Sequence, residues 1–516
     1  MRKSIIVPAT VAVSIEKNAR ICTISYQKMI SFLCSKIPFR IAYTVFNMMS
    51  GRQKNGNEIP LNTMISDFYE DGMAICLAKE ELAISILKEH QINPDTLKYE
   101  GDQWPEEWKQ HEDMLMNFEG LQEIQALINP SDIIDNSEFF HAEIIEEESD
   151  ERKSKDELVE IGKKLYSQPD TREILIRRIR RSSRIEAEVE DFEWIVNGFI
   201  KWYNENVTDS SCKILRLWTI EKGSEWTVYI SIDAVYVDKQ SGNHIKGGKP
   251  EMKDKTNKIS HWNISVEFDG LRYSITAKTL HGAFQQLFAF LISNDLMNRY
   301  FVFFADGEQT IFDTVKECFA DFDKMRILDW FHITEKLKQR LSSAIVHEMV
   351  EDPRSVAKAE NTGKKSDIKR CAKSVLYERK LKSILWVGNV AEATSYLRNI
   401  DPKDIKNQTA IEKLIDYLNR KKEWITCYAI RRRLGLRNSS NGSEGDNQTI
   451  VAKRQKDNLM SWSEMGSYAA SNVNIVYINE EDETWYREGK VTFSVPQSRR
   501  EEAKAKIKKQ VHGKMN

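Results

Sequence analysis

The sequence predicts an α/β fold built around a mixed five-stranded sheet, and three observations carry this prediction. Residues 225–277 contain three runs rich in β-branched and aromatic residues, and an Asp-Gly pair separates the last two runs. A wholly apolar run, YFVFFA, follows at residues 300–305. Between and after these runs, apolar residues recur at the spacing of a helix. The expected order is therefore three strands, helix, strand, helix, strand and helix.

The first three strands form an antiparallel meander in this prediction. The first strand is EWTVYISIDAVYV, residues 225–237, because its residue types favour an extended backbone. A polar, glycine-containing loop is expected at residues 238–258. The runs WNISVEF, residues 262–268, and LRYSITA, residues 271–277, flank Asp269-Gly270, and such a pair is the strongest short signal for a hairpin.

The elements after the meander alternate between helix and strand. Residues 280–296 have the pattern of an amphipathic helix, and the apolar run 300–305 suits a central strand covered on both faces. A helix at 308–319, a brief strand at 326–328 and a helix at 330–346 complete the series. This order of elements is that of the ribonuclease-H-like fold.

A chain of 516 residues is too long for one ordinary hydrophobic core, so several regions are expected. They are a mainly helical N-terminal region at 1–160, a basic helical connector at 161–224, the first part of the sheet core at 225–347, an all-α insertion at 348–430, the remaining, helical part of the core at 431–490 and a basic, frayed tail at 491–516. In the N-terminal region, residues 73–90 have apolar residues at helical spacing.

The charge of the chain is nearly balanced, with 76 basic and 78 acidic residues. A nucleic-acid-binding protein of this composition must segregate its positive charge. The segment TREILIRRIRRSSR, residues 171–184, does so, with clustered Arg177, Arg178, Arg180 and Arg181. Two interpretations stay open: a helix whose charges face water or the acidic run at 143–151, and a helix that contacts phosphates.

The seven cysteines form no CxxC pair, so the spacings of structural zinc sites are absent. Their odd number and scatter suit a reducing cytosol. Pro8 interrupts the apolar run near the N-terminus, and no apolar run approaches the roughly 18 residues that span a bilayer. We therefore expect a cytoplasmic protein with no membrane partner.

Two aspartates stand where a carboxylate needs a partner. Asp233 lies inside the first strand between Ile232 and Ala234, and a carboxylate in an apolar run is costly unless it is paired or binds a metal. Asp306 directly follows the apolar strand, and ligands bind at the carboxyl ends of strands in open α/β sheets. If the two strands are neighbours, both carboxylates can approach one point. The alternatives are a buried structural role for Asp233 and capping of the next helix by Asp306.

A third acidic residue, Glu444, lies in a polar segment that opens a new helix. Ser443 and Asp446 fit a capping box, which places Glu444 in the first helical turn, where the helix dipole favours its ionised form. Mg²⁺ binds a few such carboxylates together with waters and phosphate oxygens. Alternatively, Glu444 only complements the dipole. Basic residues farther along the same helix either hold a DNA strand or face water, namely Lys453, Arg454 and Lys456.

Four blocks of sequence, in order, resemble bacterial insertion-sequence transposases of the DDE class. They are FFADGEQTIFDTV from residue 303, RILDWFHITEKL from residue 326, LWVGNVAEA from residue 385 and SNGSEGDNQTIVAKRQKDNLMSWS from residue 440. The resemblance covers about residues 225–490, and we find none in residues 1–160. One departure is Gly445, where relatives are expected to carry serine or a similar residue after the glutamate.

The resemblance implies that Asp233, Asp306 and Glu444 are the catalytic, metal-binding residues. It implies two Mg²⁺ ions, for which Mn²⁺ can substitute, with Asp233 bridging both and the other two residues each holding one. Asp329 and His332 match a D-x-x-H motif and are expected to support the active site by ordering the DNA or the catalytic loop. The alternative for His332 is a capping or core histidine.

The implied substrate is double-stranded DNA, both transposon ends and target, and pairing of two ends implies a homodimer or a larger synaptic complex. DNA recognition is assigned to residues 1–225, without a helix-turn-helix or zinc module. Such a protein would act on the nucleoid in the cytoplasm. Two other functions stay open: a transposase-derived DNA-binding protein without catalysis, and a nuclease or resolvase of the same fold that cuts without joining.

Overall fold

The structure is a computed structural model of the whole chain. It describes residues 4–7, 20–50, 52, 56, 58–108, 227–240, 258–322, 324–353, 355–356, 368–433, 436–440, 447–456 and 462–513.

The N-terminal part is mainly helical where it is described. Strands β1 (Ser4–Val7) and β2 (Arg20–Thr23) pair in parallel. The helices that follow are α1 (Ile24–Lys36), α2 (Phe39–Met49) and α3 (Leu61–Glu89), with a single turn η2 (Glu106–Trp108). The long helix α3 confirms the helix predicted at residues 73–90.

A mixed five-stranded sheet forms the centre of the molecule, in the order β5-β4-β3-β6-β7. Its strands are β3 (Thr227–Asp238), β4 (Lys258–Phe268), β5 (Leu271–Ala277), β6 (Tyr300–Ala305) and β7 (Lys324–Leu328). The first three pair antiparallel, whereas β6 pairs in parallel with both β3 and β7. All five predicted strands are therefore confirmed.

The hairpin between β4 and β5 turns at the predicted Asp269-Gly270 pair. Both residues have positive φ, 50° at Asp269 and 77° at Gly270, as a tight two-residue turn between antiparallel strands requires. Arg299 binds the Asp269 carboxylate with two hydrogen bonds of 2.7 and 3.0 Å. The turn is thus fixed both by its backbone and by an ion pair.

Three helices complete the predicted alternation, namely α11 (Leu280–Ser293), α12 (Gln309–Cys318) and α13 (Trp330–Ala344). Every residue of β6 is buried, which explains its continuous apolar sequence. Phe319, just after α12, packs its ring against Phe301 and Phe303 of β6. Burial of each such ring contributes roughly 1.5–3 kcal/mol, so this strand anchors the core.

The insertion after α13 is mostly but not wholly helical. Its helices are α15 (Lys373–Trp386), α16 (Val390–Arg398), α17 (Gln408–Lys421) and α18 (Tyr428–Arg433), with turns η5 (Pro402–Asp404) and η6 (Lys422–Trp424). Strands β8 (Met349–Glu351) and β9 (Arg370–Ala372) pair antiparallel at its start. The all-α expectation was wrong in this detail, because three-residue strands are too short to show a period of two in the sequence.

The C-terminal part contains a π-helical turn η7 (Gln448–Ala452) and the helices α20 (Lys453–Gln455), α21 (Glu464–Ile478), α22 (Asp482–Glu488) and α23 (Gln497–Gly513). The expectation of a frayed tail was wrong, because residues 497–513 form α23. Arg500 and Lys504 of this helix lie 3.3 and 3.7 Å from the Asp269 carboxylate, so ion pairs tie the tail to the β4–β5 turn.

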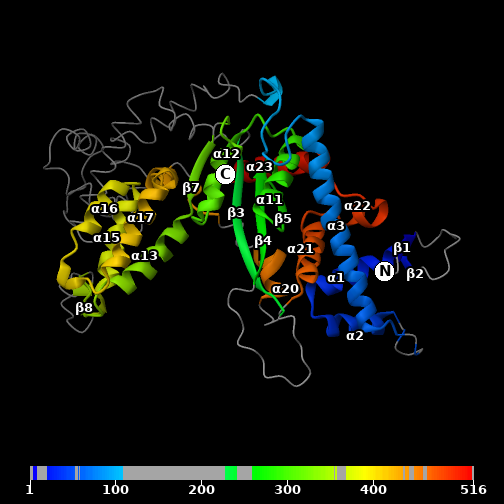
Figure 1. The fold of residues 1–516 in the computed structure, drawn as a ribbon, viewed down its shortest axis with the longest axis horizontal. Coiled ribbons are helices and arrows are strands. Elements are labelled where there is room, and N and C mark those ends of the chain that lie inside the picture. The colour runs from blue at the N-terminus through cyan, green and yellow to red at the C-terminus, as the bar shows by residue number, and fades with distance from the viewer. Residues whose placement is uncertain are drawn as a thin grey trace.

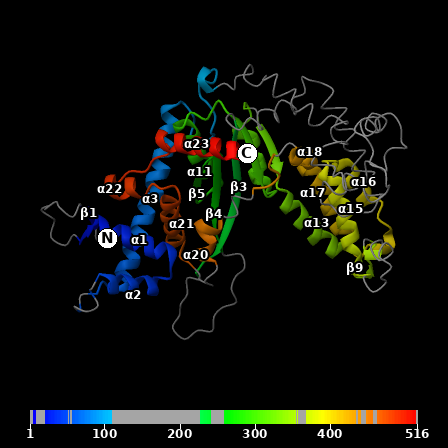
Figure 2. The same cartoon turned by 180° about the vertical axis from the view of Figure 1, so that it is seen from behind.

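The N-terminal helices pack on the C-terminal helix α21. Gly72 of α3 approaches the backbone of Ala469 so closely that a Cβ there would lie 2.4 Å from the Ala469 carbonyl oxygen. These helices share a hydrophobic core with Val235 and Val237, at the end of β3. Figures 1 and 2 show the sheet between this helical layer on one side and the insertion helices α15–α17 on the other.

Candidate active site

Three carboxylates follow the last paired residues of three adjacent parallel strands. Ile232 of β3 pairs with Ala305 of β6, and Ala305 pairs with Leu328 of β7. The next residue on each segment is an aspartate, namely Asp233, Asp306 and Asp329. The condition for Asp233 and Asp306 to approach one point is met, because β3 and β6 are neighbours in the sheet, and their carboxylates stand at one edge of it.

Asp233 accepts hydrogen bonds on both carboxylate oxygens. Its Oδ1 accepts from the backbone N–H of Ala234 at 2.8 Å, and its Oδ2 accepts from the side-chain amide of Asn447. Each carboxylate oxygen has two lone pairs, so these bonds fix the side chain without using all of its acceptor capacity. The carboxylate is therefore held in one orientation at the edge of the sheet.

Burial and a second carboxylate raise the pKa of Asp233. Burial is the larger cause and the charge of Asp306 the next, and together they bring the pKa to about 6. The Ala234 N–H and the charge of His332 act in the opposite direction, while Glu308 adds to the repulsion. A half-buried carboxylate that is repelled by a second one carries an electrostatic cost, which a bound cation would relieve.

Asp306 stands in a tight turn at the start of α12. Its Oδ1 accepts from the backbone N–H of Glu308 at 2.9 Å, and because Glu308 is the N-cap residue of α12, this bond closes a turn before the helix and the capping alternative was wrong. Gly307 has φ +102°, and a Cβ there would lie 2.9 Å from the hydroxyl of Tyr417. Among the described residues, Oδ2 of Asp306 has no hydrogen-bond partner, which leaves this oxygen available to a ligand.

A chain of amides continues from Asp233 across the sheet. The Asn447 side chain donates to Asp233 and accepts from the Asn263 amide at 2.8 Å. Asn263 in turn accepts from the Thr276 hydroxyl at 2.7 Å. The sequence prediction missed both asparagines, yet Asn263 is the residue opposite Asp233 in the β3–β4 register, so a predicted register could have found it.

Asp329 joins the start of α13 to residues 438–440. It is 2% exposed, and its Oδ1 accepts from the N–H of Phe331 at the start of α13. Its Oδ2 accepts from both the backbone N–H and the hydroxyl of Ser440, each at 2.7 Å. The Trp330 N–H also donates to the Asn438 carbonyl at 3.3 Å. Asp329 thus fastens residues 438–440 to the carboxyl edge of the sheet.

His332 lies on the first turn of α13 and is half-buried. Its ring packs edge-on against Phe331, and its charge lowers the pKa of Asp233. A D-x-x-H spacing at a helix start explains the arrangement, because one residue caps the helix and the other projects from its first turn.

The predicted basic residues differ in exposure. Lys453 and Lys456 are exposed, whereas Arg454 is 2% exposed and its guanidinium lies 4.9 and 4.7 Å from the ring centres of Phe39 and Trp462. Its Nε donates to the Cys34 carbonyl at 2.9 Å. The predicted DNA contact of Arg454 is therefore corrected: this side chain joins the N-terminal helices to the C-terminal part.

Some predicted residues lie outside the described residues, namely Glu444, Arg177, Arg178, Arg180 and Arg181. Within the described residues, no three or more His, Cys, Asp and Glu side chains are grouped as a metal site would require. Asp233 and Asp306 supply two carboxylates, and their mutual repulsion and the open Oδ2 of Asp306 fit a shared divalent cation.

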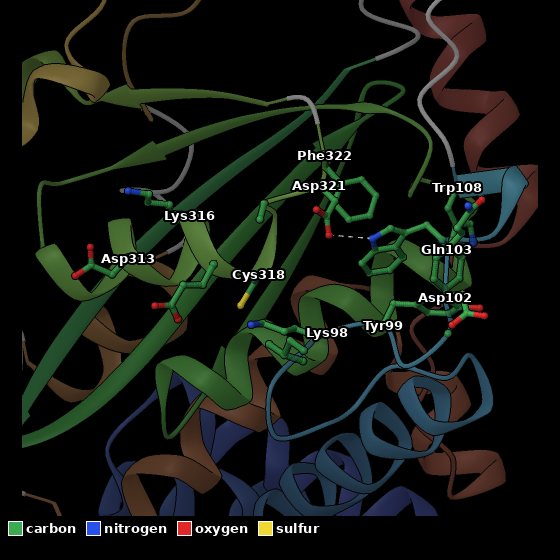
Figure 3. Close-up of a pocket in the computed structure, with 15 residues that line it drawn as sticks. Lys98, Tyr99, Asp102, Gln103, Trp108, Asp313, Lys316, Cys318, Asp321 and Phe322 are labelled. Atoms are coloured by element: carbon green, nitrogen blue, oxygen red, sulfur yellow. Dashed lines mark hydrogen bonds between the residues drawn. The ribbon is translucent and has the colours of Figure 1, made fainter.

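A cavity of about 1180 Å³ lies at the C-terminal end of α12, away from Asp306 (Figure 3). Tyr99 and Trp104 stack there with ring centres 5.1 Å apart, and the Trp104 indole donates to Asp321 at 3.0 Å. None of the predicted site residues lines this cavity. It is thus separate from the carboxylate site.

Comparison of the chain with protein-family models, with curated proteins and with solved structures found no match. In the part of the chain that the structure describes, every helix is either too short or too polar for a membrane span.

Proposed function

We propose that this protein is a DNA transposase of the DDE class, which cleaves phosphodiester bonds at transposon ends and joins them to target DNA. The observation that carries the proposal is the pair Asp233 and Asp306, in register at the ends of neighbouring parallel strands, with the pKa of Asp233 raised to about 6 by burial and by Asp306. Perturbed carboxylates at such an edge are typical of functional sites.

The fold supports the proposal through its order of elements. A three-stranded antiparallel meander is followed by helix, strand, helix, strand and helix, and the sheet order is β5-β4-β3-β6-β7. We propose that this is a ribonuclease-H-like core interrupted by a helical insertion. Because one fold hosts many activities, the functional argument rests on the carboxylates and not on the sheet.

Glu444 is proposed as the third carboxylate. In sequence it stands between Ser440 and Asn447, whose side chains contact Asp329 and Asp233. The contacts on both sides tie the flanking residues to the same edge of the sheet. The position of Glu444 between these two contacting residues supports the sequence-based choice of Glu444 independently of the resemblance.

Two Mg²⁺ ions, or Mn²⁺ in their place, would be held by Asp233, Asp306 and Glu444 and would supply activation of the attacking oxygen and stabilisation of the leaving oxygen. The chain itself would hold the carboxylates still: Asn447 and the Ala234 N–H orient Asp233, and the Glu308 N–H orients Asp306. Positioning of the reacting groups and stabilisation of charge account for most of the catalysis of phosphoryl transfer by a protein.

The proposed reaction has two steps. In the first, a water oxygen bonds to phosphorus at the transposon end and the bond from phosphorus to the 3′ oxygen breaks, which leaves a 3′ hydroxyl. In the second, that hydroxyl attacks a phosphodiester of the target strand and displaces its 3′ oxygen. Acting on two ends at once calls for a homodimer or larger complex, and a transposase would work on DNA of the nucleoid.

The test is cleavage and joining of a labelled duplex that carries the DNA flanking this gene, with Mg²⁺ or Mn²⁺. Wild type is compared with Asp233→Ala, Asp306→Ala and Glu444→Ala, and with Asp238→Ala, an exposed aspartate at the end of β3, as the matched control. Loss of cutting with retained binding in the three variants, and normal cutting in the control, is expected.

Three other outcomes would change the proposal. Normal cutting by the Glu444→Ala protein would remove Glu444 from the site. Cutting at all sequences without joining would indicate a nuclease or resolvase. Binding of the ends without cutting under either metal would indicate a DNA-binding protein derived from a transposase.

A further inference from the structure

A basic cleft opens beside Asp306, between α13 and α17 of the insertion. Its volume is about 540 Å³, within the roughly 300–1,000 Å³ common for ligand sites. The first wall of the cleft is the turn from Asp306 to Gln309. The helices contribute five cationic side chains, namely Lys336, Arg340, Lys413, Arg420 and Lys421, and one carboxylate, Asp416.

The spacing of these residues places them on the facing sides of two packed helices. Lys336 and Arg340 are four residues apart on α13, which puts them on one helical face. Lys413 and Arg420 are seven apart on α17, two helical turns along a single face. The cations of the cleft therefore come from one face of each helix and not from a single loop.

None of the five cations forms an ion pair with a carboxylate among the described residues. By contrast, two other cations of the insertion are paired: Lys373 lies 3.0 Å from Glu348, and Arg379 lies 2.9 Å from Asp352. Unpaired cations gathered in a concave surface raise the local concentration of anions. The cleft thus has the electrostatics of an anion site.

Lys421 gives the strongest indication of an anion. It is 3% exposed, yet its ammonium has one hydrogen bond, to the Gln309 amide oxygen at 2.7 Å, and otherwise lies over the Phe312 ring at 3.8 Å. An ammonium has three donors, and the nearby carboxylates of Asp306, Glu308 and Asp313 attract this charge without forming an ion pair with it, so its burial is only partly compensated. An anion in the cleft would satisfy the remaining donors.

Tyr417 adds a second open donor in the same place. Its hydroxyl is buried without a hydrogen-bond partner among the described residues, and it lies next to Gly307 at the rim of the carboxylate site. The Lys336 ammonium lies 5.6 Å from the centre of the Tyr417 ring. A ligand in this cleft would therefore meet cations on one side and a hydroxyl donor beside Asp306.

We propose that this cleft binds the phosphodiester backbone of a nucleic acid strand. It would hold the phosphates next to the one that is cleaved beside Asp306. The position of this cleft relative to the cleaved phosphate rests on the proposed function. The binding of an anion in the cleft does not depend on it. Consecutive phosphates of one strand suit cations that are spread along two helices, whereas the carboxylates of Asp306 and Glu308 in the first wall disfavour a compact anion close to them.

The test measures DNA binding without catalysis. The full chain is titrated against a fluorescent 20-mer, single-stranded and duplex, in EDTA over a series of KCl concentrations. The cleft variant is Lys336→Gln/Arg340→Gln. The matched control is Lys338→Gln/Arg398→Gln, which removes two charges from α13 and α16 outside the cleft.

The cleft variant is expected to lower the slope of log Kd against log salt by about two, since each lost phosphate contact removes about one. Its Kd at 0.15 M KCl should rise about 10- to 30-fold, because each contact has a salt exponent of about 0.7–0.9. The control should match wild type. Lys421→Met should lower the slope by about one, and if it fails to fold, the partly exposed pair at 336 and 340 still decides the question.

Equal slopes for the cleft variant and the control would overturn the inference. The two proposals fail separately. If the cleft variant lowers the slope of log Kd against log salt but wild type never cuts DNA, the transposase proposal fails and the nucleic acid site stands. If wild type cuts DNA normally but the cleft variant leaves the slope unchanged, the nucleic acid site fails and the transposase proposal stands.

Discussion

Removal of the charge at Asp233 is predicted to stabilise the metal-free protein. The pKa of this carboxyl in the folded state is about 6, about two pH units above its ordinary value of 3.8, because burial and Asp306 disfavour the charged form. Each pH unit corresponds to about 1.4 kcal/mol. At pH 8 the ionised Asp233 therefore costs the folded state up to about 3 kcal/mol, and Asp233→Asn should recover about 1–3 kcal/mol.

The sign of the pH dependence follows from linkage. A carboxyl whose pKa is raised on folding binds its proton more tightly in the folded state, so folding stability falls as pH rises from about 4 through 6. Below pH 4 the carboxyl is protonated in both states, and the cost vanishes. The advantage of Asp233→Asn should therefore be largest at pH 7–8 and disappear near pH 4.

The amide chain can accommodate asparagine at position 233. Asn447 now donates to Asp233 and accepts from Asn263, which accepts from Thr276. If both amides rotate by half a turn, Asn447 accepts from the new amide, donates to Asn263, and Asn263 donates to the Thr276 hydroxyl. The amides keep their partners, and only the Thr276 hydroxyl loses its acceptor and must turn to another, so the substitution removes the charge and displaces a single buried donor.

Urea unfolding in EDTA, followed by tryptophan fluorescence at pH 4, 6 and 8, measures this difference. Asp238→Asn, an exposed position at the end of the same strand, is the control and should change stability by less than about 0.5 kcal/mol. Equal stability of Asp233→Asn and wild type at pH 8, or a gain that persists at pH 4, would refute the electrostatic reasoning.

Three further predictions concern the residues around the carboxylates. Asn447→Leu removes the donor to Asp233 and should lower the rate of metal-dependent cleavage about 10- to 100-fold in single-turnover assays; an unchanged rate would contradict the positioning role. Asp329→Ala loses the bonds to Ser440 and the cap of α13 and should lower the unfolding free energy by about 2–4 kcal/mol in urea titrations; a loss below about 1 kcal/mol would argue against it. Gly307→Ala should cost about 1–3 kcal/mol, because of its positive φ and its 2.9 Å approach to the Tyr417 hydroxyl, and the cost should be smaller in a Tyr417→Phe background; equal costs in both backgrounds would rule out the clash.

The sheet could be predicted from the sequence because its signals are local. The run YFVFFA matches β6 residue for residue, and Asp269-Gly270 marks the β4–β5 turn. Both depend on residues that are adjacent in the chain. Strands β8 and β9 could not be predicted, because three-residue strands owe their pairing to tertiary contacts.

The candidate site could be predicted from the sequence only where a single residue suffices to indicate it. Asp233 stands out as an acid in an apolar strand, and Asp306 as an acid at a strand end. Asn447 does not stand out, because its role exists only when it meets Asp233, 214 residues away in sequence. Arg454 was misassigned for the same reason: a basic run does not reveal that Phe39 and Trp462 enclose one of its members.

The central claim is that Asp233 and Asp306 bind a divalent cation together, and Mn²⁺ binding measured by electron paramagnetic resonance tests it most directly. The measurement compares wild type with Asp233→Asn, Asp306→Asn and the control Asp238→Asn, each with the flanking-end duplex bound. The account predicts Mn²⁺ binding by wild type and the control, weakened at least about tenfold in each of the two site variants. No Mn²⁺ binding by wild type, or equal affinity in all four proteins, would contradict it.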